Sequence, residues 1–288
     1  MKEYIFLIIA ALLFSLQFLF QKAYQRKEGE SLSSAFLFSG IYAAVGMAYL
    51  LIATGFRLEF SLFSLGLAVV YGTAVLECTY CSVNALKNTD ISTFSAFMML
   101  GGMLLPFVAG LTFFREPLTY AVFLCCALII LALLLEYLAK KGAEKKTLKY
   151  CFIVFILNGL CGVLSKTHEY FTAANIDSMS YMFYGYAAVV VIVFAYYLIK
   201  GKAPKPKKAV SLIYCGLYSA ATTVANLLTL FALKVLPASV NYPFLTGGTM
   251  LFSTLIGVFL LKEKIKPLNV VAIAAALLAV VLLVVLPV

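Results

Sequence analysis

The chain has 288 residues, of which 64% are hydrophobic and only 12% are charged, and its mean hydropathy is +1.04. An average soluble domain is nearer ~45–50% apolar and ~25% charged, so this composition excludes a protein that folds as a globule in water. The formal net charge is +10. The lysines flank apolar runs and form no stripe on a polar fold, which argues against nucleic-acid binding and resembles the loops of a membrane protein.

Apolar runs of about 20 residues, the length that crosses a hydrocarbon core of ~30 Å, recur along the whole chain. Because backbone amides in lipid must be satisfied internally, each run is predicted to be a transmembrane helix, including the first, which we interpret as a helix and not a signal peptide. The predicted helices are, within a few residues, 4–21, 34–54, 64–86, 92–113, 118–139, 149–165, 179–199, 209–233, 238–261 and 267–287. The sequence thus predicts an all-α integral membrane protein of ten transmembrane helices.

The second half of the sequence repeats the first. At an offset of 147 residues, Ala85-Leu86-Lys87 matches Ala232-Leu233-Lys234, and at an offset of 144 Tyr42-Ala43-Ala44-Val45 matches Tyr186-Ala187-Ala188-Val189. Each copy holds five helices, and five is odd, so the second copy must enter the membrane from the opposite side. This predicts two inverted five-helix repeats, an architecture of many secondary transporters. The expected division is a first repeat (1–139), a basic linker (140–148) and a second repeat (149–288).

The basic residues fall unevenly on the loops. Seventeen of the 22 Lys and Arg residues belong to the loops on the side opposite the two termini. The positive-inside rule then predicts that both termini lie outside the cell.

One motif occurs once in each half. Gly110-Leu-Thr-Phe-Phe-Arg115-Glu116 is followed by a short turn and another apolar run, and Gly257-Val-Phe-Leu-Leu-Lys262-Glu263 repeats this arrangement. The whole chain resembles the drug/metabolite transporter superfamily, specifically its ten-helix EamA-type permeases. In that resemblance Glu116 and Glu263 correspond to the glutamate at the turn of each half, and Lys22 and Lys166 to a lysine late in the first helix of each half.

The resemblance implies a carrier of a metabolite or drug that works by alternating access. It also implies cytoplasmic termini, against the charge count, so the orientation stays open. Glu116 and Glu263 fall at helix ends, where we expect them to cap a helix or form an ion pair and not to bind substrate.

Glu77 is the most informative single residue, because an acid near the middle of a membrane span costs roughly 2.5–3.5 kcal/mol on insertion scales. It shares one helical face with Thr73, Tyr80 and Asn84. We expect Glu77 on the wall of a central cavity formed by the first, third and fourth helices of each half. There it would bind a cationic substrate or a coupling proton. The alternative is a protonated glutamate that bonds to a neighbouring helix.

Further candidates for substrate binding are polar residues in predicted helices near the centre of the bundle. Together with Glu77, the predicted substrate site comprises Tyr80, Asn84, Gln17, Asn158, Tyr184, Asn226, Asn241 and Tyr242. The alternative for the amides is helix–helix hydrogen bonding, worth ~0.6 kcal/mol on average. Pro106 and Pro243 are expected to interrupt their helices near such a site.

Two residues are expected outside the site. Tyr181 is assigned to the interfacial aromatic belt, and His168, the only histidine, to an exposed polar loop.

No catalytic, zinc-type or phosphate-binding motif is present, and the seven cysteines form no recognisable framework. We therefore expect no enzyme, no cofactor and no metal. The sequence predicts a cell-membrane secondary transporter of a small organic metabolite, such as an amino acid, an amine or a cationic compound, with proton coupling through Glu77. The alternatives are a multidrug exporter and a membrane receptor or partner subunit. The expected partners are the substrate and the lipid bilayer, and the expected state is a monomer or homodimer.

Overall fold

The computed structural model describes residues 2–29, 31–87, 91–116, 119–138, 145–171, 174, 176–201, 209–262 and 267–285. Across these ranges the chain is all-helical and contains ten helices, as predicted. They are α1 (Lys2–Glu28), α2 (Leu32–Ala53), α3 (Leu62–Ala85), α4 (Ile91–Thr112), α5 (Tyr120–Leu138), α6 (Lys145–Tyr170), α7 (Ser178–Lys200), α8 (Val210–Leu233), α9 (Ala238–Leu261) and α10 (Pro267–Val285).

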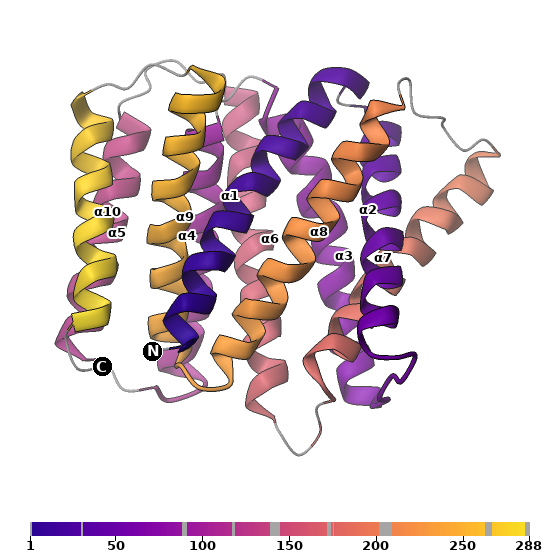
Figure 1. The fold of residues 1–288 in the computed structure, drawn as a ribbon, viewed down its shortest axis with the longest axis horizontal. Coiled ribbons are helices and arrows are strands. Elements are labelled where there is room, and N and C mark those ends of the chain that lie inside the picture. Colours follow the sequence, from indigo (N-terminus) through magenta and orange to yellow (C-terminus); the bar gives the residue numbers. More distant parts are fainter. Residues whose placement is uncertain are drawn as a thin grey trace.

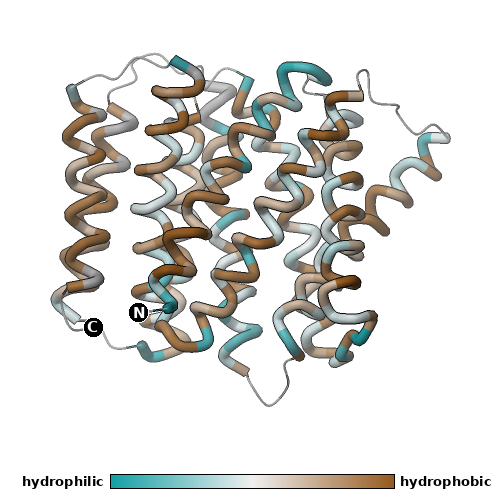
Figure 2. The backbone as a smooth tube through the Cα atoms, viewed as in Figure 1, coloured by the Kyte–Doolittle hydropathy of each residue, from teal (hydrophilic) through white to brown (hydrophobic). Residues whose placement is uncertain are grey.

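Seven of the described helices are long and apolar enough to cross a membrane: α1, α2, α3, α6, α7, α8 and α9. Shorter apolar stretches lie in α4, α5 and α10. Hydrophobic residues run along the helices and hydrophilic ones gather mainly towards their ends (Figure 2). The chain is therefore a multi-pass membrane protein.

Helix boundaries follow local capping chemistry. Asp177 precedes α7 and its Oδ1 accepts hydrogen bonds from the amides of Met179 and Ser180, at 2.8 and 3.1 Å. At the other end of α7, Gly201 takes a left-handed conformation with φ of 68°, which glycine adopts without steric cost.

Two expectations about helix continuity are wrong. α6 runs on through residues 166–169, where an exposed loop was expected, because its polar side chains are buried among partners and need no water. The helices α4 and α9 also continue without a break through Pro106 and Pro243.

The helices form two layers (Figure 1). One layer has the order α10, α9, α1, α8, α2, and the other α5, α4, α6, α3, α7, with neighbours in each list in contact. Towards the two edges the layers touch directly, α10 on α5, α9 on α4 and α2 on α7. In the middle, α1 and α8 face α6 and α3 with far less direct contact. A space between the layers follows from this arrangement.

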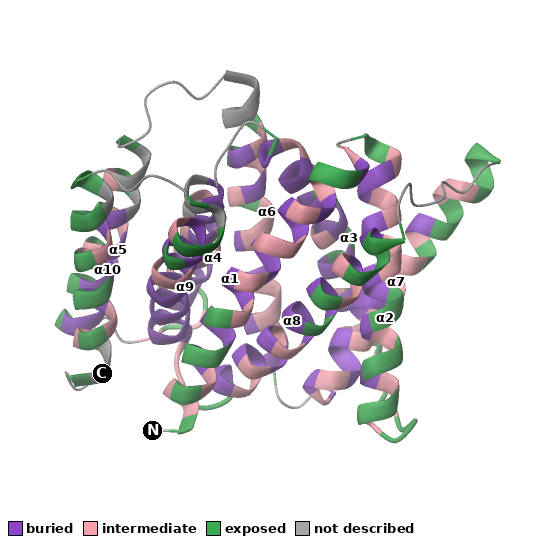
Figure 3. Ribbon diagram, turned by 45° about the horizontal axis from the view of Figure 1, so that its top comes forward, coloured by how far each residue is buried: buried purple, intermediate pink, exposed green. Residues whose placement is uncertain are grey.

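Glycines allow close approach within a layer. A Cβ on Gly101 of α4 would lie 1.9 Å from the carbonyl oxygen of Phe155 in α6, and a Cβ on Gly72 of α3 would lie 2.4 Å from that of Gly185 in α7. Both glycines therefore serve packing. Buried residues gather on the faces that the helices turn to one another (Figure 3).

Both termini lie at the same end of the bundle (Figure 1). At this end the segment before α3 bonds to the segment between α6 and α7. Glu59 Oε2 accepts a hydrogen bond from the Asp177 amide at 2.7 Å, and the Ser61 hydroxyl donates to the Ala174 carbonyl at 2.7 Å. We call this the terminal end.

Candidate functional site

A cavity of about 120 Å³ lies between the two layers. Helices α1, α3, α4, α6, α8 and α9 line it, as the sequence predicted, and α2 and α7 contribute as well. The lining residues are Phe14, Gln17, Gln21, Tyr42, Tyr71, Val75, Cys78, Thr79, Ser82, Met98, Met99, Gly102, Asn158, Cys161, Gly162, Ser165, Tyr181, Met182, Tyr186, Tyr218, Thr222, Asn226, Thr229, Leu230, Tyr242, Leu245 and Thr246.

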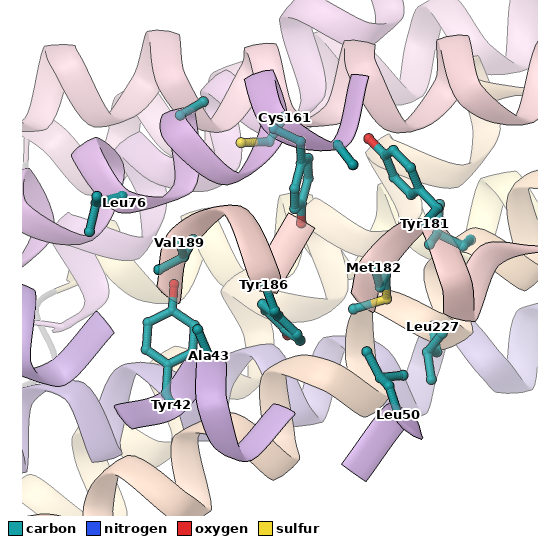
Figure 4. Close-up of a cluster of buried hydrophobic side chains, with 14 of the residues drawn as sticks. Tyr42, Ala43, Leu50, Leu76, Cys161, Tyr181, Met182, Tyr186, Val189 and Leu227 are labelled. Carbon is teal, nitrogen blue, oxygen red and sulfur yellow. The ribbon is translucent and has the colours of Figure 1, made fainter. Parts of the chain in front are cut away.

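The cavity wall is uncharged and rich in tyrosine. None of the described lining residues is Asp, Glu, Lys, Arg or His. The ring of Tyr42 lies 5.0 Å from that of Tyr218 and 6.1 Å from that of Tyr186, centroid to centroid. Figure 4 shows Tyr42 and Tyr186 on neighbouring helices, with Tyr181 and Met182 nearby. Within the described residues, aromatic faces and hydroxyl groups, not ions, therefore line the cavity.

Hydrogen bonds between helices fix the polar part of the wall. The Thr222 hydroxyl donates to Gln17 Oε1 at 2.7 Å, which joins α8 to α1. Asn158 Nδ2 donates to the Met98 carbonyl at 2.7 Å, which joins α6 to α4. The Tyr242 hydroxyl donates to the Gly162 carbonyl at 2.8 Å, which joins α9 to α6. Gln17 bonds through its oxygen and Asn158 through its nitrogen. A substrate would therefore meet Nε2 of Gln17 and Oδ1 of Asn158.

The structure brings four of the predicted site residues to the cavity: Gln17, Asn158, Asn226 and Tyr242. That they bind substrate stays a prediction. Each of the first two also makes the helix–helix hydrogen bond that was the alternative interpretation.

The placement of Glu77 on the cavity wall is wrong. Its side chain is exposed on the surface of α3, as is that of Thr73 in the same stripe. The opposite face of α3, with Tyr71, Cys78 and Ser82, lines the cavity. The stripe is polar, but it points away from the bundle centre.

Four more predicted residues lie outside the cavity. Tyr80 packs against Tyr150, with ring centroids 6.4 Å apart, and Asn84 Nδ2 donates to the Tyr80 carbonyl of its own helix. Tyr184 packs against Phe60 and Phe183. Asn241 is fully buried beside α8, where its Nδ2 lies 3.5 Å from the Thr229 carbonyl.

Sequence reasoning missed most of the cavity tyrosines. Tyr181, assigned to the interfacial belt, is 1% exposed and lines the cavity. Tyr42 and Tyr186 occupy equivalent positions at the 144-residue offset, and Tyr71 and Tyr218 at the 147-residue offset. Tyrosines conserved between the two copies of the repeat were the signal that could have found them.

An ion pair lies at the terminal end, next to the cavity. Lys166 Nζ of α6 is 2.8 Å from Glu116 Oε1, and the same carboxylate accepts hydrogen bonds of 3.0 Å from the amides of Ala238 and Ser239 at the start of α9. This confirms that Glu116 caps and pairs. Burial raises the pKa of Glu116, but Lys166 and the two amides outweigh it, so the pKa lies below its ordinary value of 4.5. Glu263, its counterpart in the second half, lies outside the described residues.

Ten described helices around a central, uncharged cavity define a polytopic membrane protein. The EamA-like transporter family matches residues 145–285. The second half of the chain therefore belongs to this family of membrane transporters.

A solved crystal structure of a protein shares the fold over nearly its whole length. It has a TM-score of 0.66 and 15% sequence identity, and the match covers 98% of this chain and 96% of that one. At that identity the likeness concerns the fold alone. No curated protein matches the chain.

Proposed function

We propose that this protein is a secondary transporter that moves a small organic metabolite across the cell membrane by alternating access, with the substrate bound in the cavity between the two layers. The observation that carries the proposal is that cavity, an internal space between apolar helices with amide and hydroxyl groups on its wall. Interior polar groups at that depth are typical of a transport pathway.

The packing supports two inverted repeats. If each helix of the first half is exchanged for its counterpart in the second, α1 for α6 and so on, one layer becomes the other. The cavity wall follows the same rule: Tyr42 pairs with Tyr186, Tyr71 with Tyr218, and Thr79 with Asn226. Movement of the two layers against each other would then open the cavity first to one side of the membrane and then to the other. In this proposal all ten helices cross the membrane, and the terminal end faces outside because it carries few basic residues.

The size and charge of the cavity restrict the substrate. Drug-sized ligands occupy pockets of roughly 300–1,000 Å³, whereas a dry cavity of ~150 Å³ takes a molecule the size of benzene. At about 120 Å³ this cavity suits a compact metabolite better than a drug. Tyrosine faces would favour an aromatic or quaternary ammonium group, and the uncharged wall disfavours an anion, which would lose its hydration without a partner.

A binding and flux experiment tests the proposal. The purified protein is screened by thermal shift against compact amino acids, amines, nucleosides and sugars, since a ligand of the native state raises apparent stability. Each compound that binds is then followed as a radiolabel into proteoliposomes. We expect saturable uptake that Asn226→Ala weakens, with Tyr184→Phe, outside the cavity, as the matched control. Binding without flux would instead favour a receptor, and flux unaffected by Asn226→Ala and by Gln17→Ala would remove the cavity from the pathway.

A further inference from the structure

A group of buried ionisable side chains lies on the last turns of α6, beside the terminal end of the cavity. His168 is fully buried, and its Nδ1 lies 3.4 Å from Glu169 Oε1. The Glu169 carboxylate also accepts a hydrogen bond of 2.8 Å from the Ser178 hydroxyl in the first turn of α7. Lys166, one turn earlier, holds the ion pair with Glu116. The transport site described above uses none of these four groups.

The imidazole of His168 is connected to the cavity through an aromatic ring. It stacks on Tyr181 at 4.0 Å between centroids, with the two planes 17° apart. Tyr181 belongs to the cavity wall. A change in the position or charge of this imidazole therefore reaches the wall through one direct contact.

Titratable groups near His168 also lie on the neighbouring elements of the described structure. On α6 itself they are Lys166, Glu169 and Cys161. From the other elements they are Glu116 after α4, Tyr71 of α3, Asp177 and Tyr181 at the start of α7, and Tyr242 of α9, which interacts electrostatically with both Glu116 and Glu169. Glu59 and Arg115 nearby are exposed.

The charges of the four buried groups do not balance while the imidazole is neutral. Two carboxylates, those of Glu116 and Glu169, face one ammonium group, that of Lys166, and all three side chains are at most 11% exposed. With both carboxylates ionised, one proton on His168 brings the formal charge of these four groups to zero. Uncompensated charge is costly in such surroundings, and histidine is the side chain that ordinarily changes its charge between pH 5 and 8.

We propose that the His168–Glu169 pair is the proton-binding site that couples this transporter to pH, in place of Glu77. The bound proton completes an imidazolium–carboxylate pair that holds α6 against the start of α7. When the proton leaves, the repulsion between the two carboxylates is no longer offset, and the terminal end of the cavity opens. The coupling role of this proton rests on the proposed transport function. Proton binding itself can be measured without a substrate.

The first experiment observes the proton directly. His168 is the only histidine in the chain, so a protein labelled with ¹⁵N-histidine and freed of any histidine tag gives the ring signals of one residue. We expect these signals to titrate reversibly between pH 5 and 8, and Glu169→Gln to move the midpoint to lower pH, because it removes the anion that favours the charged ring. A ring that keeps one protonation state across this range overturns the proposal, and so does a midpoint that Glu169→Gln leaves in place.

The second experiment connects the proton to the cavity. The maleimide labelling rate of Cys161, in the cavity wall, is divided by that of Cys125, which is buried between α5 and α10. Peptide mass spectrometry resolves the two sites, and the ratio removes the common pH dependence of thiol chemistry. We expect the ratio to rise about fivefold or more from pH 5.5 to 8, as typical couplings allow. The rise should be lost in His168→Gln and kept in Glu77→Gln.

The controls separate the possible failures. A constant ratio in the wild type, or a rise that survives His168→Gln, overturns the coupling, and a rise lost in Glu77→Gln returns the role to Glu77. If His168→Gln does not fold, the titration of the wild type and the Glu169→Gln variant still decide the question. A titrating His168 in a protein that moves no solute in proteoliposomes would refute the transport function and leave the proton site standing.

Discussion

The Glu116–Lys166 pair is the one ionic contact in the described structure that ties α6 to both α9 and the segment after α4, and its removal should be costly. The change Glu116→Gln keeps one side-chain oxygen for the amide of Ala238 or Ser239, so most of the capping is retained. It removes the negative charge that faces Lys166 at 2.8 Å, where the two side chains are only 8–11% exposed.

The expected loss follows from the unpaired lysine. Breaking one partner of a buried pair costs roughly 3–5 kcal/mol, and we expect about 3 kcal/mol here because the pair lies at the end of the bundle. Lys166→Met should cost less, about 1–2 kcal/mol, because Glu116 keeps its two amide donors. The double variant should be more stable than the sum of the single losses predicts, with a coupling of about 1–2 kcal/mol.

The measurement is the free energy of unfolding of all four proteins in the same micelles, by titration with a denaturing detergent. The pKa of Glu116 lies below its ordinary value of 4.5, so its contribution is fully present above that pH and is lost as the pH falls through the folded pKa. Stability of the wild type should therefore decline on the acid side of 4.5, and Glu116→Gln should remove part of that decline. A loss below about 1 kcal/mol with no coupling would refute the reasoning that the pair joins these elements.

Three further outcomes can be checked by thermal unfolding and by ligand binding. Gly101→Ala should destabilise the protein by more than about 1 kcal/mol, because its Cβ would collide with the Phe155 carbonyl, whereas Gly66→Ala, whose Cβ meets nothing within 4 Å, should be neutral or stabilising; equal effects would contradict the close packing of α4 on α6. Glu77→Gln should leave the dissociation constant of any cavity ligand within about twofold, since the residue is exposed; a loss of about tenfold, or 1.4 kcal/mol, would contradict this. Tyr242→Phe should lower stability by about 1 kcal/mol through the lost bond to Gly162, and an unchanged unfolding temperature would count against that bond.

The fold was largely predictable because membrane spans obey a strong constraint. Runs of about 20 apolar residues can satisfy their backbone only as helices, and all ten predicted runs are helices. The boundaries were less accurate where charged residues are paired inside the protein. Lys166 and Glu169 read as a loop in the sequence, but the helix continues because Glu116 and Ser178 bind them.

The site was only partly predictable, because polarity alone does not indicate which way a membrane helix faces. The stripe that includes Thr73 and Glu77 contains the most polar residues of α3, yet it is exposed, while Tyr71, Cys78 and Ser82 face the cavity. In water a polar stripe faces outward by default, and in lipid it was expected to face inward. Tyrosine, cysteine and serine are compatible with both surroundings, so hydropathy did not select them.

The repeat carries the missing information. Tyr42 and Tyr186 share the 144-residue offset and Tyr71 and Tyr218 the 147-residue offset, and each pair contributes to the cavity from opposite layers. In the proposed inverted repeat each tyrosine pair faces the same space from two sides, so these pairs indicate the axis of the bundle. Glu77 has Val224 as its counterpart and fails this criterion. His168 also lacks a histidine counterpart, since Tyr24 occupies the 144-residue offset, and a proton site that acts at only one end of the bundle would have to differ between the two halves in this way.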